Sequence, residues 1–417
     1  MSARARATTV TIAAILAGAL IAPATFAGAA APEPNGDVVR AWNDLALDSI
    51  RVTKGSDATA ARVYAMTNVA MYDAVNGLRA KKDRRTPAVV APNGTAKGDA
   101  AVAAAQAAHD VLVGLYPARQ GQFDSRLATD VGAAPANDQT EKGRMWGANV
   151  AAAVLAARAN DGTNPAALPP FAIADPARYK GGPPPDTSTL DYAAAFNTVK
   201  ILGDSRNVDQ AKTDTFWFWS LGAGSDQPPG AWVQVAELVS ASRHLTLTDT
   251  TRLLALETIA MSDTVAPTNV TKQTYNRIRP TFAIHDAESD SNPFTVDDDG
   301  WTARSPSAGS PGEYWSGHSA FSAAASTTLA GFFCDDRADF TLTTDVQTGA
   351  LQANAPRTFS SFSGAANEAG MSRIYGGLHF PYSNQAGLAA GGDVADEVLG
   401  HALLLQGQPT HRGACPL

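Results

Sequence analysis

Four long segments in the first part of the chain place apolar residues three and four positions apart, the spacing of one face of an α-helix. Alanine is dense in these segments, which raises helix propensity and lets neighbouring helices approach closely. Alternation of β-branched with polar residues, the pattern of a strand, is scarce. The sequence therefore predicts an all-α fold, with helices at Val38–Val52, Asp57–Leu78, Gly98–Tyr116 and Asp138–Asn160.

The second half of the chain is also expected to be helical. The Pro/Gly-rich interval Asn164–Pro185 separates it from the first half and is interpreted as a long connector or as a lid over a site. A helix through Leu253–Met261 is expected to end before Pro267. Further helices are predicted at Thr271–Arg279, Ser316–Phe333, Gly364–Ile374 and Gln385–Gln406. We predict two packed helical bundles, residues 32–180 and 181–417, with a functional site in the second.

Residues 1–31 differ from the rest of the chain. Arg4 and Arg6 precede the apolar run Val10–Ala22, and small residues follow at 27–31. The run is short for a membrane span, so we interpret it as a cleaved Sec-type signal peptide, with an uncleaved anchor as the alternative. Because no later segment is apolar for long enough, we expect a secreted protein without stable membrane insertion.

Charge and cysteine content narrow the function classes further. Without Arg4 and Arg6 the 32 basic residues fall to 30, against 40 acidic ones, so nucleic acid is not an expected partner. Cys334 and Cys415 are the only cysteines. In an oxidising exterior they would form one disulfide, and two free thiols are the alternative. The sequence has no CxxC motif, so a zinc site with cysteine ligands is not expected.

Three short segments carry a distinctive set of polar groups: Lys272-x6-Arg279-Pro280, Ser316-Gly317-His318 and Ser372-Arg373-x5-His379. Guanidinium groups and an ammonium suit a tetrahedral oxyanion such as phosphate or vanadate. A Ser-Gly step that opens a helix adds backbone N–H groups and the positive end of the helix dipole. Lys272 and Arg279 are seven residues apart, so on one helix they would lie two turns along the same face.

This three-part pattern is similar to the signature shared by vanadium-dependent haloperoxidases and type 2 phosphatidic acid phosphatases, across roughly residues 255–405. In addition, residues 60–66 and 71–76 resemble helices of soluble bacterial haloperoxidase homologues. The resemblance implies a vanadate cofactor, whose site phosphate could also occupy, and neither haem nor flavin. The implied partners are hydrogen peroxide, halide and a small organic substrate, and a homo-oligomer is compatible with the sequence.

The resemblance also assigns roles to individual residues. His379 would be bonded to vanadium, or to phosphorus in a phosphatase, and His318 would be the acid/base near the apical oxygen. Lys272 would additionally donate to peroxide. Five residues would bind the equatorial oxygens of the anion: Lys272, Arg279, Ser316, Gly317 and Arg373.

The chain departs from the family pattern at two positions. Trp315 stands where proline usually precedes Ser-Gly-His, and Ser383 stands where an acidic residue usually orients the ring of the histidine four positions earlier. Asp393 or a backbone carbonyl could take over that role. Tyr314 and Trp315 are expected to form a packed wall or to present an aromatic edge to the substrate, and His285 could line the entrance.

Three functions remain open at this stage. The leading hypothesis is a secreted haloperoxidase, favoured by the long N-terminal helical half and by the missing acid at Ser383. The second is a soluble acid phosphatase in which His379 attacks phosphorus to form a phosphohistidine and His318 protonates the leaving group. The third is a non-catalytic secreted protein that retains the fold and an anion site.

Overall fold

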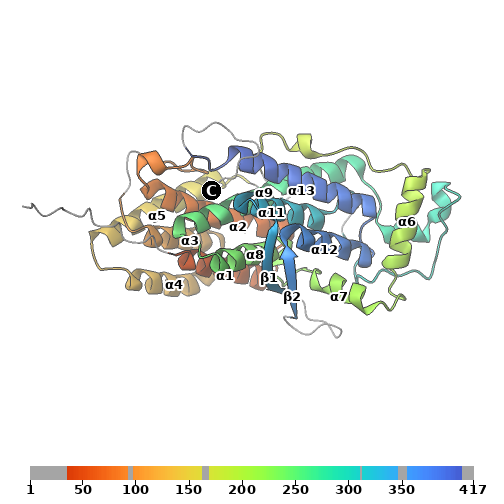
Figure 1. The fold of residues 1–417 in the computed structure, drawn as a ribbon, viewed down its shortest axis with the longest axis horizontal. Helices are drawn as coiled ribbons and strands as arrows, with labels where there is room; N and C mark the ends of the chain where they lie inside the picture. The colour runs from red at the N-terminus through yellow and green to blue at the C-terminus, as the bar shows by residue number, and fades with distance from the viewer. Residues whose placement is uncertain (1–34, 93–96, 162–168, 310–311, 346–354, 406–417) are drawn as a thin grey trace, which may run out of the picture. The chain divides into compact units, whose positions relative to one another are not determined.

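The computed structural model describes residues 35–92, 97–161, 169–309, 312–345 and 355–405, and they are mostly helical (Figure 1). The prediction of an all-α fold is therefore confirmed. The predicted signal peptide at residues 1–31 and Cys415 lie outside the described residues, whereas Cys334 is disulfide-bonded. None of the described helices combines the length and hydropathy that a bilayer span requires. Residues from Pro34 onward form one compact unit, and a division near residue 180 stays a prediction.

The helices of the first half confirm the four predicted there and add one more. α2 lies at the centre and packs against α1, α3 and α5, and it also contacts α8 and α9 of the second half. Its first turn is capped by Ser56, whose hydroxyl accepts the N–H of Thr59. The five α-helices are α1 (Asp37–Thr53), α2 (Asp57–Leu78), α3 (Ala100–Leu115), α4 (Gln120–Ala133) and α5 (Asp138–Ala157).

In the second half, α9, α11 and α13 pack against one another as the central layer (Figure 1). An antiparallel pair, β1 (Arg337–Thr343) and β2 (Pro356–Ser361), was not predicted, although its buried residues alternate along β1. The helices are α6 (Leu190–Leu202), α7 (Gln210–Phe218), α8 (Gln227–Ser242), α9 (Leu247–Tyr275), α10 (Pro280–His285), α11 (Gly317–Phe333), α12 (Phe362–Tyr375) and α13 (Pro381–His401).

The predicted break before Pro267 is wrong. α9 continues through this proline to Tyr275, and Asn276 in the left-handed conformation ends it. Pro267 lacks the N–H that would bond the previous turn, a loss that usually breaks an exposed helix. Here the helix is buried for most of its length, and the hydroxyls of Thr264, Thr268 and Thr271 each donate to the carbonyl four residues back, at 2.8 Å. Tertiary packing therefore outweighs the local penalty.

Two buried aspartates tie loops to the two central helices in the same way. Asp73 of α2 accepts the backbone N–H groups of residues 88, 89 and 90, and Asp263 of α9 accepts those of residues 171, 172 and 173. Burial raises the pKa of both carboxyls to about 6, although the N–H donors oppose this shift. The second contact fixes residues 171–173 of the connector against α9.

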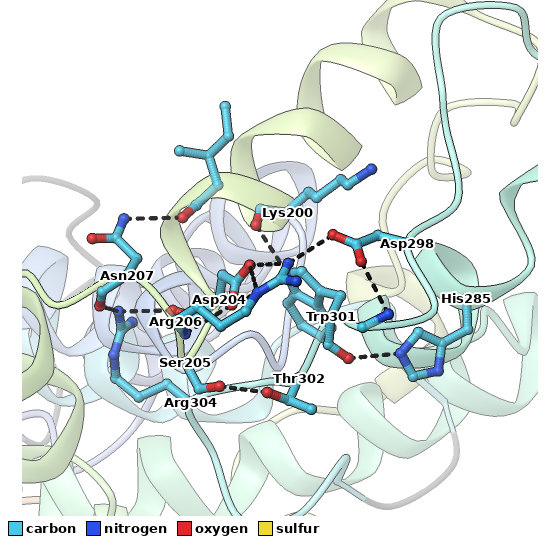
Figure 2. Close-up of polar contacts among 12 residues, drawn as sticks. Lys200, Asp204, Ser205, Arg206, Asn207, His285, Asp298, Trp301, Thr302 and Arg304 are labelled. Atoms are coloured by element: carbon cyan, nitrogen blue, oxygen red, sulfur yellow. Dashed lines mark hydrogen bonds and ion pairs between the residues drawn. The ribbon is translucent and has the colours of Figure 1, made fainter.

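The acidic segment after α10 is held by ion pairs and backbone contacts instead of being freely solvated (Figure 2). Asp298 accepts from Arg206 at 2.7 Å and from the N–H of Gly300. The indole of Trp301 donates to the carbonyl of Lys200. No group of three or more acidic, His or Cys side chains in the described part is arranged to hold a metal ion.

Close contact between α11 and α13 depends on two glycines of α13. A Cβ at Gly391 would overlap the carbonyl oxygen of Ala320, and one at Gly387 would lie 2.5 Å from the carbonyl oxygen of Ser316. The two glycines are four residues apart, so they face α11 on the same side of α13. This contact sets the distance between the segments that lead into the starts of the two helices.

We expect Gly391→Ala to lower the free energy of unfolding by about 2 kcal/mol, because the added methyl forces α11 and α13 apart. Gly392→Ala is the matched control, since a Cβ there would meet only Thr327 Oγ1 at 3.6 Å. It should be neutral or stabilising by up to about 1 kcal/mol. Urea denaturation of both variants measures the difference, and equal stabilities would contradict this account of the packing.

Candidate active site

One cavity of about 340 Å³ brings together six of the seven predicted site residues. All six lie in the second half of the chain, at or near the ends of helices. They are Lys272, Arg279, Gly317, His318, Arg373 and His379. Ser316, the seventh, is fully buried behind the cavity wall. Its hydroxyl accepts the N–H of Ser319 and so caps α11, as the sequence predicted for this helix start.

Lys272 and Arg279 do not lie on one helix face, as the sequence analysis expected. Lys272 is in the last turn of α9, whereas Arg279 lies beyond the helix end and directly precedes α10. The left-handed turn at Asn276 redirects the chain between them. The two cations therefore reach the cavity from separate backbone segments.

The cations of the site are buried close together. Arg279 is 6% exposed and Arg373 is 8% exposed. Burial, and then the positive charge of Arg279, lowers the pKa of Lys272 to about 7 and that of Arg373 to about 9. Such a cluster is costly without a compensating anion. This charge distribution favours an oxyanion as the ligand.

Arg373 provides the clearest sign of an absent partner. Its Nε and Nη1 atoms are buried, and neither has a hydrogen-bond partner among the described residues. Buried guanidinium donors are normally satisfied, so these two point to a ligand with oxygen acceptors. Gly317 adds the start of α11, where the first N–H groups have no intrahelical partner.

His318 is half-buried, and its Nε2 atom is buried without a hydrogen-bond partner. The ring hydrogen-bonds to the backbone of Trp219. Burial, with the charge of Arg373 adding to it, lowers its pKa well below the usual value. His318 is therefore neutral near pH 7 before an anion binds.

His379 is 5% exposed and lies between a cation and a carboxylate. Arg279 Nη1 is 2.7 Å from its Nε2, and Glu313 Oε1 is 3.2 Å from its Nδ1. Burial lowers the pKa of the His379 imidazole well below its usual value, and burial raises that of the Glu313 carboxyl. His379 therefore has an acidic partner, which is Glu313 instead of a residue at position 383. Asp393, the substitute suggested by the sequence, is exposed.

Glu313 and Asp57 are the two site groups that sequence reasoning missed. Glu313 could have been suspected as a lone acid three residues before Ser316, beside two aromatic residues. Asp57 begins α2 and lines the cavity, within electrostatic range of Lys272 and Arg373. Burial raises its pKa. Nothing in the sequence marks Asp57, because it is far from the other segments along the chain.

Several residues considered for the entrance lie elsewhere. His285 Nε2 is 2.7 Å from the carbonyl oxygen of Trp301, outside the cavity lining (Figure 2). Trp315 is buried and donates to Thr268 Oγ1, and Tyr314 packs against Tyr275, so both form the packed wall. None of the described residues of the connector lines the cavity.

Comparisons with known proteins agree with this arrangement. Residues 252–407 match the family model for the VCPO second helical-bundle domain. A bacterial vanadium-dependent iodoperoxidase is similar in structure, with a TM-score of 0.71 and 20% identity over 88% of this chain and 97% of that chain. The chain has the vanadium-dependent haloperoxidase fold. A search of curated protein sequences yields no match.

Two forms of a bacterial vanadium-dependent chloroperoxidase share the haloperoxidase fold with this chain. The holo form has a TM-score of 0.65 and 15% identity over 82% of this chain and 90% of that chain. The apo form has a TM-score of 0.63 and 15% identity over 81% of this chain and 91% of that chain. The likeness therefore extends well beyond the second bundle into the N-terminal half, as residues 60–66 and 71–76 suggested.

We expect anion affinity at this site to fall as pH rises above about 7. Binding favours protonated Lys272, and the lowered pKa of the free protein means that this proton is lost above about 7. Above this pH, the contribution of protonated Lys272 to the association constant for phosphate should fall roughly tenfold per pH unit. Isothermal titration with phosphate between pH 6 and 9 measures this.

The control for this titration is Lys272→Met, which keeps the apolar stem but has no proton to lose. It binds more weakly below pH 7, and its pH profile contains only the titration of phosphate and of the other groups. If the wild-type protein and Lys272→Met had parallel profiles, the assignment of the titration to Lys272 would be wrong.

Proposed function

We propose that this protein is a secreted vanadate-dependent haloperoxidase that oxidises halide with hydrogen peroxide and halogenates small organic substrates. The observation that carries the proposal is the cavity in which Lys272, Arg279, Arg373, His318 and His379 converge. The likeness to haloperoxidases of known structure supports it at the level of the fold.

The residues present fit vanadate. The unpartnered Nε and Nη1 of Arg373 and the start of α11 at Gly317 would hold oxygens of the anion, together with Lys272 and Arg279. His379 would be the residue bonded to the metal through Nε2, after Arg279 shifts from that nitrogen to an oxygen of the anion. When bound, vanadate supplies a Lewis acid that activates hydrogen peroxide for attack by halide.

The side chains of the site would manage protons and charge around that chemistry. His318 is neutral, and its buried Nε2 is free to accept a proton from peroxide and to return it to a leaving oxygen. Lys272 would donate a hydrogen bond to an oxygen of hydrogen peroxide in the cavity.

Secretion is supported by two features. Residues 1–31 have the charge and hydropathy pattern of a signal peptide. Cys334 is disulfide-bonded, which fits folding in an oxidising compartment. Detection of the mature protein in the culture medium, cleaved after the small-residue segment, would test this part of the proposal.

A soluble acid phosphatase is retained as a second candidate because of Glu313. The missing acid at Ser383 argued against a phosphohistidine, since a charged imidazole needs an anionic partner. Glu313 Oε1 lies 3.2 Å from His379 Nδ1 and could fill that role. The two functions therefore have to be separated by experiment.

The deciding experiment measures bromination of a phenol by the mature protein with hydrogen peroxide and bromide, after incubation with orthovanadate. A vanadate-free sample is the control, and hydrolysis of a phosphate monoester is measured alongside. Bromination that requires vanadate establishes the haloperoxidase. Phosphate release that vanadate inhibits, without bromination, establishes the phosphatase and makes His379 a nucleophile. Inertness in both assays leaves a non-catalytic anion-binding protein.

Two alanine variants separate the roles of the histidines. His379→Ala should abolish retention of vanadium, because it removes the only proposed bond to the metal. His318→Ala should retain vanadium and lower the turnover number about 10²–10⁴-fold, the usual contribution of an acid/base group. Metal analysis after gel filtration, together with steady-state bromination rates, measures both effects. An unchanged rate in His318→Ala would refute its assignment.

A further inference from the structure

The buried carboxylate of Glu313 contacts three donors at the start of α13. Its Oε1 accepts the N–H of Phe380 at 2.9 Å and lies 3.2 Å from His379 Nδ1. Its Oε2 accepts the hydroxyl of Ser383 at 2.7 Å. Glu313 has no exposed surface, and these are the polar contacts of its carboxylate among the described residues, apart from nearby cations. The carboxylate therefore links the segment before α11 to the residues that carry His379.

The neighbours of His379 determine which ring nitrogen carries the proton. A carboxylate oxygen can only accept, so Nδ1 beside Glu313 must carry the hydrogen. A guanidinium can only donate, and Arg279 Nη1 is 2.7 Å from Nε2 but 3.5 Å from Nδ1, so Nε2 is the nitrogen that offers the lone pair. Two independent contacts thus require the same tautomer. It is the form that leaves Nε2 available as a ligand.

Ser383 takes part in this arrangement indirectly. It lies four residues after His379, where the family pattern usually has an acid, but its hydroxyl donates to Glu313 Oε2. The hydroxyl therefore orients the carboxylate, and the carboxylate orients the ring. The acidic partner of His379 is thus a residue of the segment before Ser316, whereas the family pattern has it at a position that lies on α13 in this chain.

We propose that Glu313 is a positioning residue that holds His379 in the Nδ1–H tautomer and directs its Nε2 lone pair into the cavity for a metal oxyanion. The negative charge raises the electron-donating strength of the imidazole, as carboxylate partners of metal-binding histidines do. The inference rests on the proposed function only in naming vanadate as the ligand. The tautomer and the contacts are properties of the protein alone.

The first test is the ¹⁵N spectrum of the wild-type protein labelled at histidine, without vanadate. His379, assigned by comparison with His379→Gln, should show a protonated Nδ1 and an unprotonated Nε2. A protonated Nε2 in the neutral ring would overturn the proposal. This readout does not depend on catalysis, so it stands even if the protein fails to brominate.

The second test compares two anions in Glu313→Gln. The amide keeps the shape of the side chain and an acceptor for Nδ1–H but removes the charge. Vanadate affinity should fall at least about tenfold, as for loss of other outer partners of metal ligands. Phosphate affinity should not fall, because removing a negative charge from a cationic pocket does not weaken an anion held by hydrogen bonds alone.

A fall in vanadate affinity without a fall in phosphate affinity distinguishes positioning from simple structural support. A parallel loss of vanadate and phosphate affinity, or an unchanged vanadate affinity, would overturn the proposal. Glu288→Gln is the matched control, because Glu288 is exposed and should leave both affinities unchanged. In the double variant Glu313→Gln with Ser383→Asp, a carboxylate at position 383 should restore vanadate affinity.

Ser383→Ala keeps the proposal testable if Glu313→Gln does not fold. It deletes one hydroxyl from a buried position and leaves Glu313 with one donor fewer. Vanadate affinity should fall about threefold to tenfold, the effect of losing one hydrogen bond, and phosphate affinity should stay constant. Absence of bromination in the wild-type protein, together with these binding results, would refute the haloperoxidase while leaving the positioning role intact.

Discussion

The central constraint on this structure is the burial of three like charges around one cavity. Burial, and then the positive charge of Arg279, lowers the pKa of Lys272 and that of Arg373. Glu313 supplies negative charge behind the cavity, but the unpartnered donors of Arg373 remain. The surrounding helices must therefore hold the cations in place against their mutual repulsion. They do so with long buried segments, of which α9 is the largest, and the site therefore has a strong preference for an anion.

The sequence allowed most of the fold to be predicted, and six of the seven predicted site residues line the cavity, because both depend on local information. Helical periodicity identified α1, α2, α3 and α5, and the three polar segments placed the cations and histidines. The failures involve long-range packing. Pro267 was read as a helix end because its penalty is local, whereas the packing that overrides it comes from α2, α11 and α13. Asp57 and Glu313 were missed because their partners lie on other elements.

The change at Ser383 illustrates how a departure from a family pattern can mislead when it is considered one position at a time. Taken alone, serine in place of an acid indicated that the ring of His379 lacks the carboxylate that usually orients it. In the structure its hydroxyl donates to Glu313, which in turn faces the ring of His379. The carboxylate beside the ring is present, but it belongs to Glu313 instead of to the residue at position 383. Neither residue would be interpretable without the other, and only the folded chain places them together.

The glycine contact between α11 and α13 has a consequence for variation within the site. His318 is at the start of α11 and His379 directly precedes α13, so the close packing at Gly387 and Gly391 makes the two imidazoles part of one rigid body. The cavity wall at Ser305, Ser307 and Gly309 belongs to a loop outside that body. Substitutions in this loop can reshape the space offered to a substrate while the separation of the histidines stays constant. The shape of the cavity can thus be changed without changing the arrangement of the two histidines. This makes the loop the natural place for substitutions that alter which molecules the cavity admits.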